Sequence, residues 1–479
     1  MSPKLPIVME KPTIILATSN GVGMGHLARA SAIALALKEY ANPIIVSMAG
    51  GIAEVPEFMG IRCEYIPGRD RLWMSREKWD AYLRDRLLAL VDETGAKVLS
   101  FDGVVPYPGV IAAKFGNPKL SLVWVRRGLW QKKPQRFVLG LQSKMMDHIV
   151  EPGDIARSYD FGPTAVRKDA TLTSPVSLFQ KNDAFTRDEA RKILGLDLSR
   201  PAVLVQLGTG DSDVNEKMTA ALSGLLGWKD LQVILTKQPL DKHGKSLAPD
   251  GLDIRVVRYF PLAKVLHAFD ASVCATGYNG VHELLPAQVP TVFVSNIRGT
   301  DDQEARAKWC HDFGFALRAD QADLADVTAK VRQLQDPEIR ARLSDKCEQL
   351  PEPTGGVEIA KILYELAIAK EPIRPSRATY LHLTIQEHIN RGLRHVAYLG
   401  LRRAGLIYRA IHPHIVVQVT RQEPPVWGDQ NTAKELHPLI KGEHRFEHLI
   451  AGASQKYKSR RAQIAEAAYG EHVEVIKKK

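Results

Sequence analysis

Two short segments of the chain combine glycines with polar side chains at spacings that suit the recognition of a nucleotide sugar. The first, residues 274–285 (CATGYNGVHELL), reads as the end of a strand, a glycine loop and the start of a helix. Backbone N–H groups of such a loop, together with a helix N-terminus, can bind a phosphate. Glu283 stands three residues after Gly280, where we expect the first helical turn, and its carboxylate can accept hydrogen bonds from ribose hydroxyls. One strand later, Asp302 and Gln303 could contact the hydroxyls of a sugar.

A histidine near the N-terminus is the candidate for acid–base chemistry. His26 follows the glycine-containing loop 18–25, which comes directly after an apolar run. At the carboxyl end of a strand, where open α/β sheets bind ligands, a neutral imidazole can accept a proton from a hydroxyl or a water. Gly23 and Gly25 let the loop approach a ligand closely, and Arg29 lies one helical turn further on. The alternative is a histidine that caps the helix or contacts a phosphate without any proton transfer.

Polar residues also follow two other apolar runs. Asp102 ends one of them and could orient His26, act as the base itself, or only cap a helix. Arg126 and Arg127 follow the run 121–125 and could hold a phosphate or carboxylate of an acceptor. A purely structural role for the two arginines is equally open.

The elements that place these residues alternate between short β-branched runs and helical stretches, which predicts parallel sheets covered by helices on both faces. We expect an α/β fold with two Rossmann-like, doubly wound domains, residues 1–173 and 174–370, followed by a basic, mostly helical extension, residues 371–479. The hinge is expected at Ser174-Pro175. The expected strands are 13–17, 43–47, 97–101, 121–125, 148–151, 202–207, 232–236, 254–257, 271–274 and 291–294, and the expected helices include 27–40, 76–93, 188–194, 213–226, 303–313, 357–369 and 456–479.

The composition excludes several classes of protein. The chain has 479 residues, of which 45% are hydrophobic and 25% charged, as in ordinary globular proteins. Its four cysteines form no CxxC pair, which argues against a zinc site or a disulfide framework. We see no signal peptide and no apolar run long enough to span a membrane, so we expect a cytoplasmic protein. Residues 47–51, where a second strand ends, contain no carboxylate, which counts against NAD or FAD.

The positive charge is concentrated in the C-terminal extension. Residues 375–479 contain 17 Lys and Arg against 9 Asp and Glu, a net charge of +8 out of +11 for the whole chain. The extension also contains a basic amphipathic stripe that includes Leu381 and Ile385. It could lie on an anionic membrane surface or simply pack on its own domain. Nucleic acid is not expected, because the extension lacks interleaved aromatic residues for stacking bases.

Three of these segments together resemble a known family of enzymes. The Gly-x-Gly-His-x-x-Arg pattern at 23–29, the segment 277–283 and the Asp302-Gln303 pair resemble the GT-B glycosyltransferases, closest to the family 28 branch with the bacterial N-acetylglucosaminyltransferases of lipid II synthesis. The resemblance covers about residues 11–370 and is strongest over 259–316. The chain departs from that branch in Gly-Met-Gly-His at 23–26, in Asp301 before the Asp-Gln pair, and in the extension.

The resemblance implies that two domains face each other across a cleft, with the acceptor and the base on the N-terminal domain and a UDP-sugar on the C-terminal one. Glu283 would bind the ribose, and the donor sugar would face Asp302 and Gln303. The remaining donor contacts would be Gly277, Asn279 and Gly280 at the diphosphate, Gly208, Thr209 and Gly210 on its other side, and Tyr259 and Phe260 at the nucleobase.

We therefore expect an inverting, metal-independent glycosyltransferase without a cofactor. It would move a sugar from a nucleoside diphosphate sugar to a hydroxyl of a glycolipid or cell-envelope polysaccharide, peripherally at the inner face of the cell membrane. His26, or else Asp102, would be the base. Two alternatives stay open: a UDP-sugar hydrolase of the nonulosonate type, in which water replaces the acceptor, and a non-catalytic nucleotide-sugar-binding protein.

Overall fold

The computed structural model describes residues 11–19, 25–48, 59–69, 74, 76–132, 139, 142–208, 212–236, 249–257, 259–368, 372, 376–378, 381–382, 385, 415–420 and 472–477. The chain separates into two units. The larger unit, residues 1–66, 88–106 and 114–374, contains both large sheets. The smaller unit consists of residues 67–87, 107–113 and 375–479.

The first sheet has seven parallel strands in the order β3-β2-β1-β4-β5-β6-β7. Its central strands are mostly apolar and are buried along almost their whole length, because strands of a parallel sheet are covered on both faces. Their carboxyl ends meet at one edge of the sheet. The strands are β1 (Thr13–Thr18), β2 (Asn42–Ser47), β3 (Arg62–Tyr65), β4 (Val98–Asp102), β5 (Ser121–Val125), β6 (His148–Glu151) and β7 (Thr171–Leu172).

The second sheet has six parallel strands in the order β10-β9-β8-β11-β12-β13. The strand order reverses beside β8, as it does beside β1 in the first sheet, and ligands of open α/β sheets bind at such points. The strands are β8 (Ala202–Gln206), β9 (Gln232–Thr236), β10 (Asp253–Val257), β11 (Ala271–Ala275), β12 (Thr291–Val294) and β13 (Leu317–Ala319).

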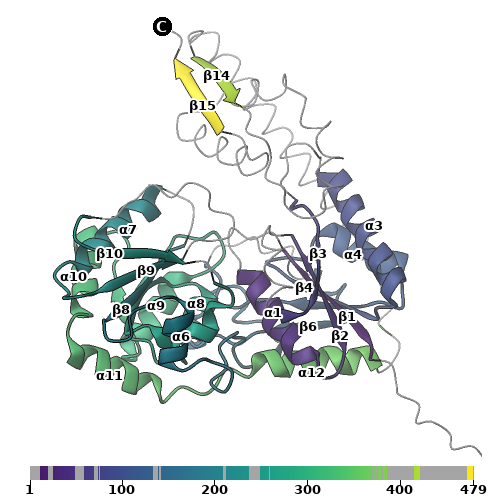
Figure 1. Ribbon diagram of the computed structural model, residues 1–479. Helices are drawn as coiled ribbons and strands as arrows, with labels where there is room; N and C mark the ends of the chain where they lie inside the picture. The colour runs from purple at the N-terminus through teal and green to yellow at the C-terminus, as the bar shows by residue number, and fades with distance from the viewer. Residues whose placement is uncertain are drawn as a thin grey trace, which may run out of the picture. The chain divides into compact units, whose positions relative to one another are not determined.

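Helices connect the strands and cover the sheets (Figure 1). In the first half of the chain they are α1 (Gly25–Leu37), α3 (Arg76–Thr94), α4 (Pro108–Gly116) and the 3-10 turn η1 (Arg157–Tyr159). In the second half they are α6 (Arg187–Ile193), α7 (Ser212–Leu225), the 3-10 helix η2 (Leu262–Ala268), α8 (Tyr278–Leu284), α9 (Gln303–Asp312), α10 (Leu324–Gln333), α11 (Pro337–Cys347) and α12 (Gly355–Ile368). These elements confirm the α/β fold with two Rossmann-like sheets.

The last of these helices returns to the first sheet. α12 runs beside α1 and beneath β1 (Figure 1), and the rings of Tyr364 and Tyr40 lie 5.7 Å apart. The domain boundary expected at residue 174 assigns α12 to the second domain, whereas the helix packs against α1 and β1 of the first sheet. Amphipathic spacing predicts that a helix buries one face, but it does not say against which sheet.

Two chain crossings connect the sheets, and they lie against each other. The backbone N–H of Gly355 donates to the Pro175 carbonyl at 3.0 Å, and the N–H of Ser174 donates to Glu358 at 3.1 Å. A Cβ atom on Gly355 would lie 1.9 Å from the Ser174 carbonyl oxygen, so this position requires glycine. The predicted hinge at Ser174-Pro175 is therefore braced by the second crossing.

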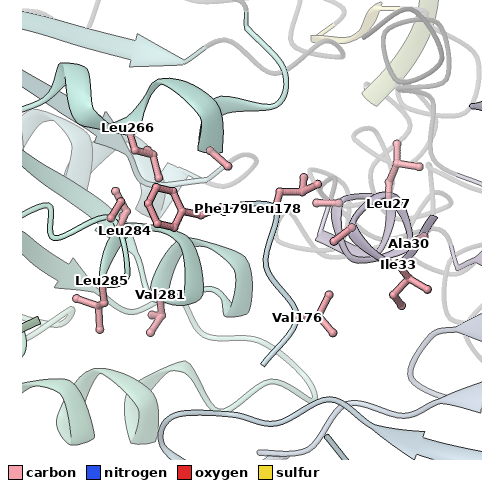
Figure 2. Packing of buried hydrophobic residues seen from close by; sticks show 14 of the residues in the cluster. Leu27, Ala30, Ile33, Val176, Leu178, Phe179, Leu266, Val281, Leu284 and Leu285 are labelled. Carbon is pink, nitrogen blue, oxygen red and sulfur yellow. The ribbon is translucent and has the colours of Figure 1, made fainter. Parts of the chain in front are cut away.

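The residues after this hinge are part of the buried core. Val176 and Leu178 lie between α1, which contributes Leu27, and the helices of the second sheet, which include α8 (Figure 2). One continuous apolar cluster therefore extends over the junction of the two sheets.

Within the smaller unit, the described residues form an aromatic contact and a two-stranded sheet. The Trp79 indole donates to the Pro67 carbonyl at 2.7 Å and meets the Tyr107 ring edge-on. The strands β14 (Ile415–Thr420) and β15 (His472–Lys477) pair antiparallel. The helix expected at 456–479 is therefore wrong for the residues of β15. The sequence HVEVIK places valine at alternate positions, and this two-residue period favours a strand.

The ten strands expected from the sequence are all present, with ends that differ by at most one residue. β3, β7, β13, β14 and β15 were not expected. The start of α8 also differs: the helix begins at Tyr278, so Gly280 lies inside it and Glu283 lies in the second turn rather than the first.

Candidate active site

His26 is the second residue of α1, which begins at the carboxyl end of β1. Its Nδ1 atom lies 2.7 Å from Oδ1 of Asp102, the last residue of the neighbouring strand β4. Arg29 lies one turn further along α1 and donates to both carboxylate oxygens of Asp102, at 2.9 Å from Nε and 2.6 Å from Nη2. The fold therefore brings together three of the residues that the sequence singled out.

These contacts define how the histidine is protonated. A carboxylate only accepts hydrogen bonds, so the contact with Asp102 requires a hydrogen on Nδ1 of His26. Nη2 of Arg29 also lies 2.9 Å from Nδ1, but a nitrogen that carries this hydrogen cannot accept from it. Burial lowers the pKa of His26, although the charge of Asp102 opposes the shift. At neutral pH the imidazole is neutral and has Nε2 available as an acceptor.

The aspartate is ionised under the same conditions. Burial by itself would raise the pKa of Asp102, but the charges of Arg29 and His26 outweigh it and lower the pKa to about 2. A buried carboxylate thus orients a neutral histidine, whose side chain is 15% exposed. This is an arrangement that general bases use.

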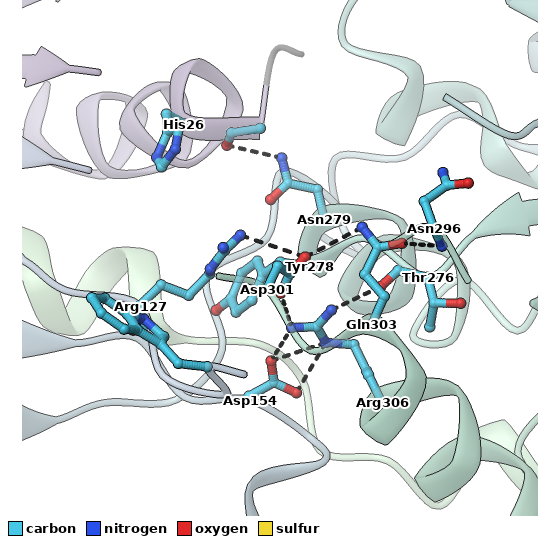
Figure 3. Close-up of polar contacts among 12 residues, drawn as sticks. His26, Arg127, Asp154, Thr276, Tyr278, Asn279, Asn296, Asp301, Gln303 and Arg306 are labelled. Carbon is cyan, nitrogen blue, oxygen red and sulfur yellow. Dashed lines mark hydrogen bonds and ion pairs between the residues drawn. The ribbon is translucent and has the colours of Figure 1, made fainter. Parts of the chain in front are cut away.

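The corresponding loop of the second sheet leads from β11 into α8. Gly277 is the N-cap residue of α8, whose first-turn N–H groups have no partner within the helix. Gly280 packs closely, because a Cβ atom there would lie 3.0 Å from Sγ of Cys274. The Asn279 amide donates to the Gly25 carbonyl at 3.1 Å (Figure 3). The loop expected at the diphosphate therefore contacts the residue that precedes His26.

Glu283 is half-buried on α8. Within the described parts of the chain, no hydrogen-bonding group or cation pairs with its carboxyl group, and burial raises its pKa to about 8. A carboxyl group that is partly open to solvent and has no partner among the described residues is suited to a ligand with hydroxyl groups.

The side chains of Asp302 and Gln303 contact the protein at the start of α9. Oδ1 of Asp302 accepts from the N–H of Ala305 at 3.1 Å, as a helix N-cap. Oε1 of Gln303 accepts from the N–H of Asn296 at 2.9 Å, and its Nε2 donates to Asp301 at 3.3 Å. The buried Gln303 thus braces the loop after β12, which favours a structural role, whereas Asp302 is partly exposed.

An ion-pair network joins the two sheets, and the sequence analysis did not identify it. Arg306 of α9 is fully buried and donates to Asp154 at 2.8 Å, to Asp301 at 3.0 Å and to the Thr276 carbonyl at 2.7 Å (Figure 3). Burial would lower the pKa of Arg306, but the two carboxylates outweigh it and raise that pKa. The available sequence signal was a charged residue shortly after a buried strand, since Asp154 follows β6.

Backbone contacts strengthen the same junction. Trp130 and Asp301 form an isolated antiparallel bridge, and the N–H of Gln131 donates to the Thr300 carbonyl at 2.8 Å. The loop after β5 is therefore paired with the loop after β12. Carboxyl-end loops of the first sheet contact carboxyl-end loops of the second.

The two arginines after β5 have different environments. Arg126 is fully buried, and its guanidinium binds Asp169 at 2.9 Å and Glu151 at 3.3 Å, which favours a structural role. Arg127 is 16% exposed and approaches Asp301 only to 3.7 Å. Figure 3 shows its guanidinium between His26 and Asp301.

The other expected donor residues are described in part. Gly208 follows β8 with a φ of +90°, a conformation that favours glycine. Tyr259 and Phe260 are half-buried against the apolar core, just before η2. The predicted contacts Gly23, Thr209 and Gly210 lie outside the described residues. In the described part of the chain no cluster of His, Cys, Asp and Glu is suited to hold a metal ion, and no helix is long and apolar enough to cross a membrane.

Comparison with known proteins identifies the second sheet. Residues 202–352 match the glycosyltransferase family 28 C-terminal domain. A UDP-N-acetylglucosamine--N-acetylmuramyl-(pentapeptide) pyrophosphoryl-undecaprenol N-acetylglucosamine transferase from Nocardioides sp. is 32% identical over 29% of this chain and 40% of its own length. The protein of the same name from Rhodococcus jostii is 24% identical over 75% of this chain and 97% of its own length. The chain thus spans less than half of the first relative but nearly all of the second.

Solved structures share the fold at low sequence identity. Phytolacca americana UGT2, complexed with UDP-2fluoro-glucose and pterostilbene, has a TM-score of 0.51 at 14% identity, covering 74% of this chain and 100% of that one. A candidate UDP-N-acetylglucosamine 2-epimerase from Listeria monocytogenes has a TM-score of 0.52 at 13% identity, covering 76% and 99%. The chain therefore has the GT-B arrangement of two Rossmann-like sheets, matches the family 28 C-terminal domain over residues 202–352, and resembles the lipid II branch of that family.

Proposed function

We propose that the protein transfers a glycosyl group from a nucleoside diphosphate sugar, with UDP as the nucleotide, to a hydroxyl of an acceptor. The observation that carries the proposal is the contact between Asn279 and Gly25 at 3.1 Å. It places the start of the family 28 segment α8 beside the residue that precedes an oriented, neutral histidine. This contact supports a donor site and a base that lie next to each other.

In the proposed reaction, Nε2 of His26 removes the proton of the acceptor hydroxyl. The oxygen then attacks the anomeric carbon in line with the departing diphosphate, and a single displacement inverts the configuration. Asp102 stabilises the imidazolium that forms and holds the ring in place. Asp102 itself is a poor base, because its pKa of about 2 leaves little tendency to take a proton at neutral pH.

The donor contacts follow the resemblance to the family. We propose that Glu283 accepts hydrogen bonds from the ribose hydroxyls, and that Tyr259 and Phe260 flank the base. Backbone N–H groups at 208–210 and 277–280 would stabilise the charge that grows on the diphosphate. Asp302, which is partly exposed, is the better candidate of the Asp-Gln pair for contact with the donor sugar.

The acceptor is proposed to be a glycolipid or a cell-envelope polysaccharide. The names of the relatives from Nocardioides and Rhodococcus specify a pyrophosphoryl-undecaprenol acceptor, which supports a lipid-linked class. Peripheral binding of the basic extension to an anionic membrane is part of this proposal. It is supported by the exposure of the apolar side chains Leu381 (60%) and Ile385 (50%).

The test is a panel of nucleotide sugars assayed with and without lipid and polysaccharide extracts as acceptors. We expect one UDP-sugar to raise the melting temperature and to release UDP only when an acceptor is present. Release of the nucleotide without any acceptor would favour the hydrolase alternative. Binding of UDP without turnover of any sugar nucleotide would favour a non-catalytic binding protein.

A further inference from the structure

Arg127 is a mostly buried cation whose guanidinium forms no hydrogen bond with the described residues. Among the described residues, its closest charged partner is Asp301, and the distance of 3.7 Å from Nη1 to Oδ2 is too long for a hydrogen bond. Nε of Arg127 is buried and has no partner. Leaving such a donor unsatisfied costs free energy, and native proteins keep few of them.

Three other buried arginines of the described chain bind carboxylates through their guanidinium groups, although Nε of Arg126 also lacks a partner. Arg29 binds Asp102, Arg126 binds Glu151, and Arg306 binds Asp154. Asp301 does not supply hydrogen bonds to Arg127, because Oδ2 is 3.7 Å away, and its carboxylate accepts from Arg306 and from Gln303 instead.

The backbone around Arg127 is nevertheless held rigidly. The Trp130 indole donates to the Arg127 carbonyl at 2.6 Å, and the N–H of Leu129 donates to Asp160 at 2.9 Å. Leu129 has a φ of +53°, a left-handed conformation that leucine rarely adopts. Such strain persists only where the surroundings fix it, and it is often found at binding sites. The turn thus fixes the backbone at Arg127, whereas the guanidinium of this residue forms no hydrogen bond with the described residues.

The location of the guanidinium connects it to the proposed base. Asp102, which orients His26, pairs in register with Val125 of the neighbouring strand β5. Arg127 follows Val125 by two residues. Figure 3 shows the guanidinium in the region between His26 and Asp301. The positive charge of Arg127 also lowers the pKa of His26.

We propose that Arg127 binds an anionic group of the acceptor, phosphate or carboxylate, close to the attacking hydroxyl, and that this pairing removes its electrostatic effect on His26. This inference rests on the proposed transfer reaction and adds the chemistry of the acceptor. A planar guanidinium suits such a group, because it can donate two parallel hydrogen bonds to it. Arg127 then acts as a positioning residue that makes the base stronger only when the correct acceptor is bound.

The charged groups around this position determine the direction of the effect. They are His26 and Arg29 from α1, Asp102 from β4, Asp301 from the loop after β12 and Arg306 from α9. The charges of Asp102, Asp301 and Arg306 are paired with protein groups. The charge of Arg127 is the least paired of this set, so its neutralisation is expected to raise the pKa of His26.

A direct test follows the His26 ring by NMR in the full-length wild-type protein and in the variant Arg127→Gln. We expect the pKa of His26 to be higher in Arg127→Gln, and inorganic phosphate to raise it in the wild type only. Arg332→Gln, which removes one exposed arginine charge from α10, is the control and should behave as the wild type. An equal response to phosphate in the wild type and in Arg127→Gln would overturn the inference.

A kinetic test compares sugar 1-phosphate, uronate methyl glycoside and neutral methyl glycoside acceptors. For Arg127→Gln we expect KM to rise about 10- to 100-fold for the anionic class that the wild type prefers and to stay unchanged for the neutral one, the size expected for a charge-assisted hydrogen bond. Arg127→Lys keeps the positive charge near His26, so the acidic limb of its pH–rate profile should match that of the wild type. Equal losses with all three acceptors, at an unchanged pH profile, would show a structural role and refute the inference. Failure of the wild type to bind or turn over any nucleotide sugar would instead refute the proposed function.

Discussion

Glu283 offers the sharpest test of the donor site, because one substitution should change stability and binding in opposite directions. The carboxyl group is half-buried, lacks a partner among the described residues, and has a pKa raised from 4.5 to about 8. The folded protein therefore holds this proton more tightly than the unfolded chain. The stabilising contribution is complete below pH 4.5 and is lost as the pH rises through about 8.

Glu283→Gln replaces the carboxyl group by a neutral amide of the same shape. One pKa unit corresponds to about 1.4 kcal/mol, so a shift from 4.5 to about 8 sets an upper limit of about 5 kcal/mol. Water screens part of this effect at a half-buried side chain, and we expect a gain of about 1–2 kcal/mol at pH 8.5, or about 1–3 °C in melting temperature. At pH 4.5 the variant and the wild type should melt together.

The same substitution should weaken the binding of UDP. Each charge-assisted hydrogen bond to the ribose contributes about 1.5–3 kcal/mol, so the affinity at pH 8.5 should fall at least about tenfold. Calorimetric titration and thermal melts at the two pH values measure both effects, with the exposed Glu365→Gln of α12 as the control. A variant that binds UDP as tightly as the wild type, or that is equally stabilised at both pH values, would refute the reasoning.

Three further predictions concern the base, the junction and the crossings. His26→Gln should lower kcat about 100- to 10,000-fold, the usual contribution of a general base, while calorimetry shows an unchanged donor affinity; a similar loss of donor affinity would point to a phosphate-binding histidine instead. Asp154→Asn removes a charge that Arg306 binds at 2.8 Å, so denaturant unfolding should show a loss of about 3–5 kcal/mol; a loss below about 1 kcal/mol would mean that the network is dispensable. Gly355→Ala places a methyl group 1.9 Å from a carbonyl oxygen, so we expect a melting temperature several degrees lower, whereas Gly277→Ala, with open space around the Cβ position, should melt within about one degree of the wild type.

The sequence was sufficient for the ten buried strands of the two large sheets that were expected, and for the residues at the carboxyl ends of β1 and β4. Short apolar, β-branched runs such as 13–17 predict buried strands. A parallel sheet then brings the carboxyl ends of these strands to the same edge. This is why His26 and Asp102, which are 76 residues apart, could both be proposed for one site and are in contact in the structure.

Partners that depend on the junction of the two sheets could not be predicted. The pairing of Arg306 with Asp154 joins residues 152 positions apart and depends on how two separate sheets meet, which no local pattern encodes. The start of α8 was misplaced because both Gly277 and Gly280 can end a loop. The structure shows that the first is the N-cap and that the second lies inside the helix, packed closely against Cys274.

The return of α12 makes the second sheet an insertion within the first domain. A fragment ending at residue 173 would lack the helix that covers α1 and β1, and it would expose apolar side chains that the intact chain buries. The two crossings lie within hydrogen-bonding distance, at 3.0 Å between Gly355 and Pro175, so a linker of a few residues could join residue 173 directly to α12. We therefore expect this excised and rejoined chain, which keeps α12, to fold better than a simple N-terminal truncation.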